Sequence, residues 1–193
     1  MMIWFAIFLY AVLLGALIFI WVDIIKLYIN KDFRKTPPLV PSFGQQKRII
    51  LERISVQLEQ SSKPLKILDP GCGTGTLLVA LAKQFPQHQF VGIEWNPITF
   101  KIAQLRCRKY NNISLIQQDM FTYSFFGFDI IACFLMQPLM EKFGQKLVQD
   151  KVSALIYSNS FYIPQFKAYE MVEVKGFYKF NNVYIYKMLD GIC

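Results

Sequence analysis

The sequence predicts an α/β fold in which a doubly wound, mostly parallel sheet follows one membrane-spanning helix. Three observations lead to this prediction: an uncharged apolar segment at the amino terminus, alternating strand and helix patterns from residue 45 onward, and a β-rich tail. The length of 193 residues suits one compact domain with an appendage. We therefore divide the chain into an anchor over 1–29, a linker over 30–44 and a domain over 45–193.

The first 22 residues contain no charged side chain. At ~1.5 Å per residue, a helix of this length spans the hydrocarbon core of a bilayer, and Trp4 and Trp21 lie where aromatic rings prefer the interface. A cleaved signal peptide is the alternative. However, the apolar run does not begin with the basic residues of a signal peptide, and no small-residue cleavage site follows it. The basic residues that follow the segment are Lys26, Lys31, Arg34 and Lys35. The positive-inside rule then predicts a single-pass membrane protein with its domain on the cytoplasmic side.

Residues 30–44 are rich in proline and charge, which is typical of a linker. An amphipathic helix is predicted over 45–60, and strands and helices alternate beyond it. Residues 128–135 are nearly all apolar, as expected for a strand covered on both faces. The predicted strands are 65–69, 90–94, 113–117, 128–135 and 154–158, and the predicted helices are 76–85, 97–110 and 138–149.

The tail has a different pattern. Residues 169–180 and 183–188 alternate and are rich in aromatic and β-branched side chains. Asn181-Asn182 between them tolerates the positive φ of a tight turn. The tail therefore predicts an antiparallel hairpin at the edge of an otherwise parallel sheet.

Charge, cysteines and histidine exclude several kinds of site. The four cysteines show no CxxC spacing and the single histidine, His88, lies in a polar stretch, so no metal is expected. We interpret the cysteines as reduced thiols and His88 as a core or surface residue. The formal net charge of +8 has no clustered aromatic platform beside it, so no nucleic acid partner is expected.

A glycine-rich turn lies between the first strand and the next helix. It reads Asp69-Pro70-Gly71-Cys72-Gly73-Thr74-Gly75, a D-x-G-x-G-x-G pattern. Glycine permits positive φ and close approach of a ligand, and the helix after it offers free N–H groups. The dinucleotide fingerprint GxGxxG needs glycine at position 76, where this chain has Thr76. The P-loop pattern GxxxxGK(S/T) is also absent. Strand, turn and helix in this order therefore indicate a nucleotide-type ligand of another class.

Acidic residues follow the next two strands. Glu94 closes the second predicted strand, where a carboxylate can accept hydrogen bonds from both hydroxyls of a ribose. Asp119 follows the third and can accept from an adenine amino group, while Met120 and Phe121 pack on the ring. The pattern indicates that these side chains line one crevice at the carboxyl edge of the sheet.

These motifs resemble the class I, seven-strand S-adenosylmethionine-dependent methyltransferases, which have a Rossmann-like sheet. ILDPGCGTG (67–75) is similar to their first motif, Glu94 to their ribose-binding acid, 118–120 to their adenine loop, and the hairpin to their reversed final strand. A nucleotide-binding domain of another kind is the alternative. The resemblance implies S-adenosylmethionine as cofactor, bound by Asp69, Gly71, Gly73, Gly75, Glu94, Asp119 and Met120.

The chain also resembles the small single-pass-membrane lysine methyltransferases that modify mitochondrial carriers and the ATP synthase c subunit, and their bacterial relatives. The similar features are the anchor, Val40-Pro41-Ser42, the small size, and segments 134–141 and 158–164. Around Gln137-Pro138 the sequence departs from the eukaryotic pattern. The resemblance implies a lysine in a membrane-associated protein as acceptor, with no identified catalytic base. A lipid or lipophilic acceptor and a non-catalytic nucleotide-binding module are the alternatives. The candidates for lining the substrate channel are Gln137, Asn159, Phe161 and Tyr162.

Overall fold

The structure is a computed structural model that describes residues 44–174 and 182–189, together with 4, 8, 10–15, 17, 18 and 21. The chain divides into two compact units, residues 1–39 and 40–193. The described residues of the first unit are helical. Among all described residues, no helix is long and apolar enough to cross a bilayer. The predicted anchor lies mostly, and the linker almost wholly, outside the described residues, so the membrane-spanning helix stays a prediction.

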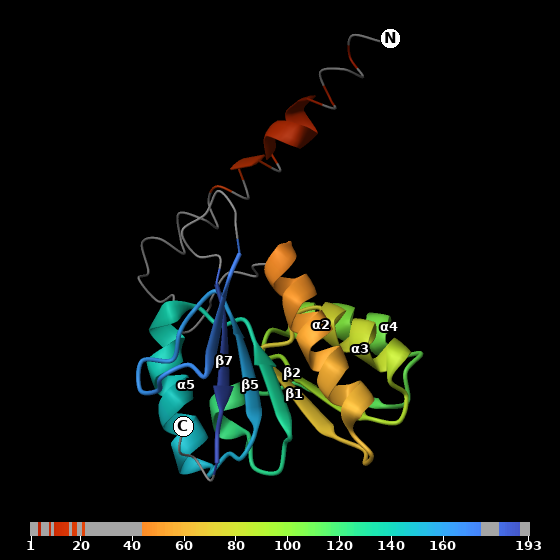
Figure 1. The fold of residues 1–193 in the computed structure, drawn as a ribbon. Coiled ribbons are helices and arrows are strands. Elements are labelled where there is room, and N and C mark those ends of the chain that lie inside the picture. The colour runs from red at the N-terminus through yellow and green to blue at the C-terminus, as the bar shows by residue number, and fades with distance from the viewer. Residues whose placement is uncertain are drawn as a thin grey trace. The chain divides into compact units, whose positions relative to one another are not determined.

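The second unit is built on a seven-stranded sheet with the order β3-β2-β1-β4-β5-β7-β6 (Figure 1). The first five strands are parallel, and β7 runs antiparallel to both of its neighbours. This confirms the predicted mostly parallel sheet with antiparallel carboxyl-terminal strands. The bounds are β1 (Lys66–Pro70), β2 (Gln89–Ile93), β3 (Ile113–Ile116), β4 (Ile130–Cys133), β5 (Leu155–Asn159), β6 (Glu170–Glu173) and β7 (Asn182–Lys187).

Helices cover both faces of the sheet. Figure 1 shows α2, α3 and α4 on one side and α5 on the other. One apolar core lies under α2 and α3, and a second lies under α5. The sheet is therefore doubly wound, as predicted. The helices are α2 (Gln45–Gln60), α3 (Thr76–Gln84), α4 (Pro97–Cys107) and α5 (Gln137–Gln149), with a short 3-10 helix η1 (Met120–Thr122) after β3.

The start of α4 follows from its sequence. Asn96 Oδ1 accepts hydrogen bonds from the N–H groups of Ile98 and Thr99, at 3.0 and 3.1 Å. Pro97 takes the first helical position, where a missing N–H is harmless. The cap fixes the point at which the chain turns from β2 into α4, directly after Glu94.

The predicted tight turn at Asn181-Asn182 is wrong. Asn182 lies inside β7, opposite Glu173, so residues 174–181 connect the two strands. The reason is the pairing of β7 with β5, which runs from Leu155↔Lys187 to Asn159↔Val183 and carries Asn182 into the sheet. The register of β7 is set by its pairing with the buried strand β5, and this pairing outweighs the local preference of Asn181-Asn182 for a turn.

The cysteines that the structure describes are buried free thiols. Cys72, Cys107 and Cys133 are each under a tenth exposed, and Cys193 lies outside the described residues. Burial raises the pKa of Cys133 to about 12 and also raises the pKa of Cys107. Such thiols pack as small apolar side chains and are chemically inert at neutral pH.

His88 is a core residue that joins α2 to the sheet. Its side chain is fully buried, and Nδ1 accepts a hydrogen bond of 2.9 Å from the Leu65 N–H. Nε2 therefore carries the proton and donates to the Leu58 carbonyl at 3.2 Å. The ring satisfies one donor and one acceptor of the backbone at the end of α2 and the beginning of β1.

We expect His88→Ala to lower the free energy of unfolding by about 2–3 kcal/mol, because it leaves the Leu65 N–H and the Leu58 carbonyl buried without partners. Urea denaturation followed by circular dichroism measures this change. Gln87→Ala, at an exposed neighbouring position, is the control and should be close to neutral. Equal stability of the two variants would contradict the assignment.

Candidate functional site

The bend after β1 is a backbone cradle. Gly71, Gly73 and Gly75 have φ of 85°, 55° and 73°, a region that side chains disfavour. At Gly75 a Cβ would also lie 2.9 Å from Cys107 Sγ. The N–H groups of Gly71 and Cys72 donate to the Ile93 carbonyl at 2.8 and 2.9 Å, which fixes the bend to the end of β2. Glycine is required here for conformation and for space.

Glu94 faces this bend. Its Oε2 accepts a hydrogen bond of 3.1 Å from the Gly73 N–H, and its Oε1 accepts one of 2.8 Å from the Asn96 N–H. The residue is 7% exposed. The structure therefore brings together the carboxylate and the bend that the sequence placed on neighbouring strands.

Asp69 is a second carboxylate at the same place. It lies in β1 opposite Gly92 of β2 and is nearly buried. Burial, and next the charge of Glu94, raise the pKa of Asp69 to about 7. A buried pair of carboxyl groups disfavours two negative charges and favours a ligand that carries positive charge. S-adenosylmethionine, the cofactor that the resemblance of the motifs implies, is a cation and has that property.

We expect the binding of S-adenosylmethionine near neutral pH to release about half a proton from Asp69, whose pKa is about 7 in the free protein. A cation nearby stabilises the ionised carboxylate and lowers its pKa, so the proton leaves on binding. Calorimetry in two buffers of different ionisation enthalpy measures the release as a difference in heat. The heat for Asp69→Asn should be the same in both buffers. A buffer-independent heat for the unchanged protein would contradict the expectation.

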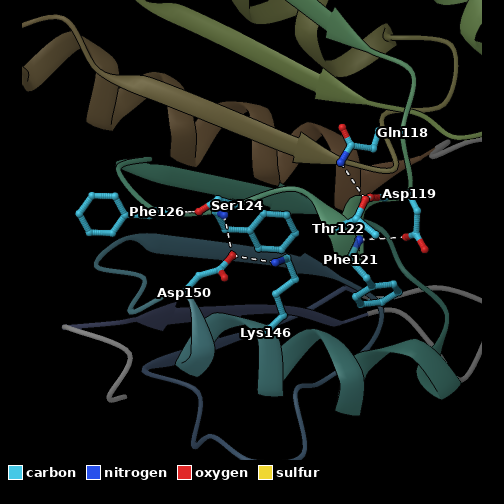
Figure 2. A network of polar contacts seen from close by, with 9 residues as sticks. Gln118, Asp119, Phe121, Thr122, Ser124, Phe126, Lys146 and Asp150 are labelled. Carbon is cyan, nitrogen blue, oxygen red and sulfur yellow. Dashed lines mark hydrogen bonds and ion pairs between the residues drawn. The ribbon is translucent and has the colours of Figure 1, made fainter.

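Asp119 and Met120 lie after β3, the strand next to β2. Asp119 Oδ1 accepts a hydrogen bond of 2.9 Å from the Phe121 N–H and caps η1 (Figure 2). The Asp119 side chain is exposed and Met120 is half-buried. Asp69, Glu94 and Asp119 thus follow one another along the carboxyl ends of β1, β2 and β3, which is the usual ligand edge of such a sheet.

Two cations beside the bend were not predicted from the sequence. Lys47 of α2 donates from Nζ to Thr76 Oγ1 at 2.8 Å, and burial lowers its pKa while the charge of Asp69 opposes this. Arg106 of α4 donates from Nη1 to the Thr74 carbonyl at 2.8 Å. Neither belongs to a local motif, since each reaches the bend only through the packing of its helix.

The four channel candidates lie at the carboxyl ends of β4 and β5. Gln137 Nε2 donates to the Tyr162 carbonyl at 3.3 Å, which joins the start of α5 to the segment after β5. Asn159 is 5% exposed, and its Oδ1 accepts a hydrogen bond of 2.9 Å from Ser160 Oγ. Ser160 has a φ of 70°, a strained backbone for a residue with a side chain.

Aromatic rings surround these residues. Phe161 stacks on Phe134 with ring centroids 6.3 Å apart, and Tyr162 meets Tyr184 edge-on at 6.3 Å. Phe134 and Tyr184 were not among the candidates; Phe134 lies in the strand predicted over 128–135 and Tyr184 in the one predicted over 183–188. The structure therefore adds two rings to the predicted set.

A glycine cradle, two buried carboxylates and a doubly wound seven-stranded sheet define a nucleotide-type donor site of the methyltransferase class. Residues 69–170, just over half of the 193-residue chain, match the family described as the ANTKMT methyltransferase domain. The chain belongs to this family. It is an S-adenosylmethionine-dependent methyltransferase.

Curated relatives are methyltransferases with different acceptors in their names. Protein-lysine N-methyltransferase of Saccharolobus islandicus is 23% identical over 153 residues, which cover 77% of this chain and 94% of that protein. Release factor glutamine methyltransferase of Geobacter sulfurreducens is 33% identical over 92 residues, 47% of this chain and 31% of that protein. Malonyl-(acyl-carrier protein) O-methyltransferase 1 of Ilyobacter polytropus is 23% identical over 99 residues, 51% of this chain and 37% of that protein. The chain spans only about a third of the length of the last two.

Solved structures share the fold. The RNA methyltransferase from Salinibacter ruber in complex with S-adenosyl-L-homocysteine has a TM-score of 0.64 and 18% identity, and the match covers 78% of this chain and 95% of that chain. MtNAS in complex with S-adenosylmethionine has a TM-score of 0.56 and 12% identity, over 74% and 62%. These similarities show the class I methyltransferase fold.

Proposed function

We propose that this methyltransferase modifies the ε-amino group of a lysine in a membrane-associated protein. The observation that carries the proposal is the group of aromatic rings at the carboxyl ends of β4 and β5, on the edge of the sheet that also carries Asp69 and Glu94. Rings of this kind suit an aliphatic chain that ends in an amine, because their faces pack on its methylenes.

In this proposal the donor lies across the carboxyl ends of β1, β2 and β3. Glu94 would accept hydrogen bonds from the ribose, and the N–H groups of the glycine bend and of the start of α3 would be available to the rest of the donor. Asp119 and Met120 hold the adenine end. The donor-binding residues proposed are Asp69, Gly71, Gly73, Gly75, Glu94, Asp119 and Met120.

The bound S-adenosylmethionine supplies an electrophilic methyl group on a sulfonium. What the chain must do is orient the amine in line with that methyl group and remove water from it. Phe134, Phe161 and Tyr162 lower the local polarity, which favours the neutral, nucleophilic amine over the ammonium ion. Nitrogen gains the methyl group, sulfur keeps the bonding pair, and the surplus proton leaves to water. No catalytic base is needed once the amine is neutral.

Family membership and the lysine methyltransferase relative support this choice of acceptor. That relative is matched over most of its own length, whereas the two relatives named for other acceptors are matched over about a third. The apolar, uncharged residues 1–22 support anchorage by a single span, and the basic residues after them support a cytoplasmic domain. Protease accessibility of the domain in sealed cells and inverted vesicles tests that location.

Incubation of membrane extracts with S-adenosylmethionine carrying a labelled methyl group tests the acceptor. Label in a protein band, located on lysine by mass spectrometry, is the expected result. Label confined to the lipid phase would overturn the proposal in favour of a lipid acceptor, and absence of donor binding by calorimetry would indicate a non-catalytic module.

Variants of the aromatic rings sharpen this test. Tyr162→Ala should reduce protein labelling about tenfold with unchanged affinity for the donor, because it removes part of the acceptor's apolar contact. Phe126→Ala is the matched control, an exposed ring that precedes the amino end of β4. Equal labelling by both variants would contradict the placement of the acceptor.

A further inference from the structure

Helix α4 exposes an apolar stripe that no described segment covers. Ile98, Ile102 and Leu105 are 74%, 42% and 66% exposed, and their spacing places them on one face of the helix. Trp95, directly before the helix, is 43% exposed. Opposite them, Ala103 and Cys107 are buried against the domain. The helix therefore has apolar side chains on two faces, one packed against the domain and one toward solvent.

The surroundings of the stripe are basic. Between Pro70 and Gln118 the only acidic residue is Glu94, which is buried and accepts hydrogen bonds from two backbone N–H groups. On the helix, Lys101 and Arg108 are exposed along one border of the stripe, and Arg106 lies on the other. The cations of this part of the chain are Lys83, Lys101, Arg106, Arg108 and Lys109.

A shallow hollow of ≈ 330 Å³ adjoins the carboxyl-terminal end of α4. Its lining includes Ile113 and Leu115 of the edge strand β3 and the basic residue Arg108. Such a combination suits a ligand that is anionic at one end and apolar at the other. The lining residues are Gln104, Cys107, Arg108, Tyr110, Ile113 and Leu115.

We propose that the α4 face, defined by Trp95, Ile98, Ile102 and Leu105, docks on an anionic lipid surface. A stripe of aliphatic side chains bordered by Lys and Arg matches the acyl–headgroup boundary of a bilayer, where apolar groups enter and cations meet phosphates. A polynucleotide would match the cations but not the aliphatic stripe. An interfacial Trp at one end of the stripe fits the same boundary.

Docking in this way has a consequence for the donor site. Helix α4 begins at Pro97, three residues after Glu94, and its Arg106 donates a hydrogen bond to the Thr74 carbonyl. A docked α4 therefore brings the β2–β3 end of the carboxyl edge close to the lipid surface. The docking is a property of the surface and holds for any methyl acceptor.

Quenching of Trp95 fluorescence tests the proposal in the 193-residue chain. The chain contains three tryptophans, so Trp4→Phe and Trp21→Phe leave Trp95 as the single reporter. The protein is reconstituted in vesicles of phosphatidylcholine alone, or of phosphatidylcholine with phosphatidylserine, both with brominated acyl chains. We expect strong quenching in the anionic vesicles and a loss of quenching in high salt.

Two pairs of variants separate docking from mere proximity. Ile98→Ser with Leu105→Ser should weaken the docking equilibrium by roughly tenfold, and Lys101→Gln with Arg108→Gln by roughly thirtyfold. Val148→Ser, at an apolar position of α5 that is 51% exposed, is the matched control and should leave quenching unchanged.

The proposal would be overturned by no quenching of Trp95, by equal quenching in the stripe variants, or by a stripe-dependent dimer in sedimentation with no lipid contact. Retention on a polynucleotide that survives the Ile98→Ser and Leu105→Ser changes would point to nucleic acid and also overturn it. Failure of methyl transfer to lysine leaves the quenching intact, so the two proposals fail separately.

Discussion

Glu94→Gln should weaken the binding of S-adenosylmethionine by about 2–3 kcal/mol, roughly 100-fold in Kd, with little change in stability. In the protein both carboxylate oxygens accept backbone hydrogen bonds, from Gly73 and from Asn96. A glutamine has one acceptor oxygen, and its NH₂ group then faces a backbone N–H. One of the two backbone N–H groups, of Gly73 or Asn96, therefore loses its acceptor, and the ribose loses an acceptor as well. Calorimetric titration with the donor measures the loss.

Glu59→Gln is the matched control, because it makes the same change at an exposed position of α2 and should leave the affinity unchanged. Thermal unfolding of Glu94→Gln separates a binding defect from misfolding. Relief of the repulsion between Glu94 and Asp69 offsets part of the lost hydrogen bonding, so Tm should move little. Donor affinity equal to that of the control would remove Glu94 from the site.

Asp150→Ala should lower the free energy of unfolding by about 3–5 kcal/mol. Lys146 and Asp150 form an ion pair of 2.9 Å, with side chains only 9% and 12% exposed. Asp150 Oδ2 also accepts a hydrogen bond of 2.7 Å from the Phe125 N–H (Figure 2). The variant therefore leaves a buried ammonium ion without its carboxylate and the Phe125 N–H without its acceptor, although the Phe125 ring centroid lies 4.9 Å from the ammonium.

The chain carries its own control for this prediction. Arg48 and Glu52 form an ion pair with the same spacing on α2, but the side chains are 80% and 61% exposed. Glu52→Ala should cost less than about 1 kcal/mol, because water replaces the partner. Lys146→Met together with Asp150→Ala should recover part of the loss by removing the unpaired charge. Urea denaturation of the three variants checks the order, and equal costs for Asp150→Ala and Glu52→Ala would contradict it.

Much of the fold follows from local pattern. The helix predicted over 45–60 has those bounds in the structure, and the strands predicted near 65–69, 90–94 and 113–117 lie within one or two residues of β1, β2 and β3. Strong periodicity and clear stop signals such as Pro86 determine these elements. The hairpin register could not be predicted in this way, because the partner of β7 that sets it is β5.

The residues proposed to bind the donor could also be predicted from the sequence, since the glycine bend and the acids after each strand are local motifs. The residues proposed to bind the acceptor could be predicted only in part. Phe134 and Tyr184 join the predicted Phe161 and Tyr162 because the carboxyl ends of β4 and β5 lie beside each other and β7 pairs with β5. Lys47 and Arg106 likewise reach the bend only through the packing of their helices.

The sequence by itself determined the order of strands and helices, the positive-φ bend and the acids that follow the strands, because backbone conformation and strand ends depend on neighbours along the chain. The tertiary structure decided which side chains share an environment. The raised pKa of Asp69, the burial of the Lys146–Asp150 pair and the exposure of the α4 stripe all depend on how much water and charge surrounds a group. Those quantities are set by segments far apart in sequence, so no local pattern contains them.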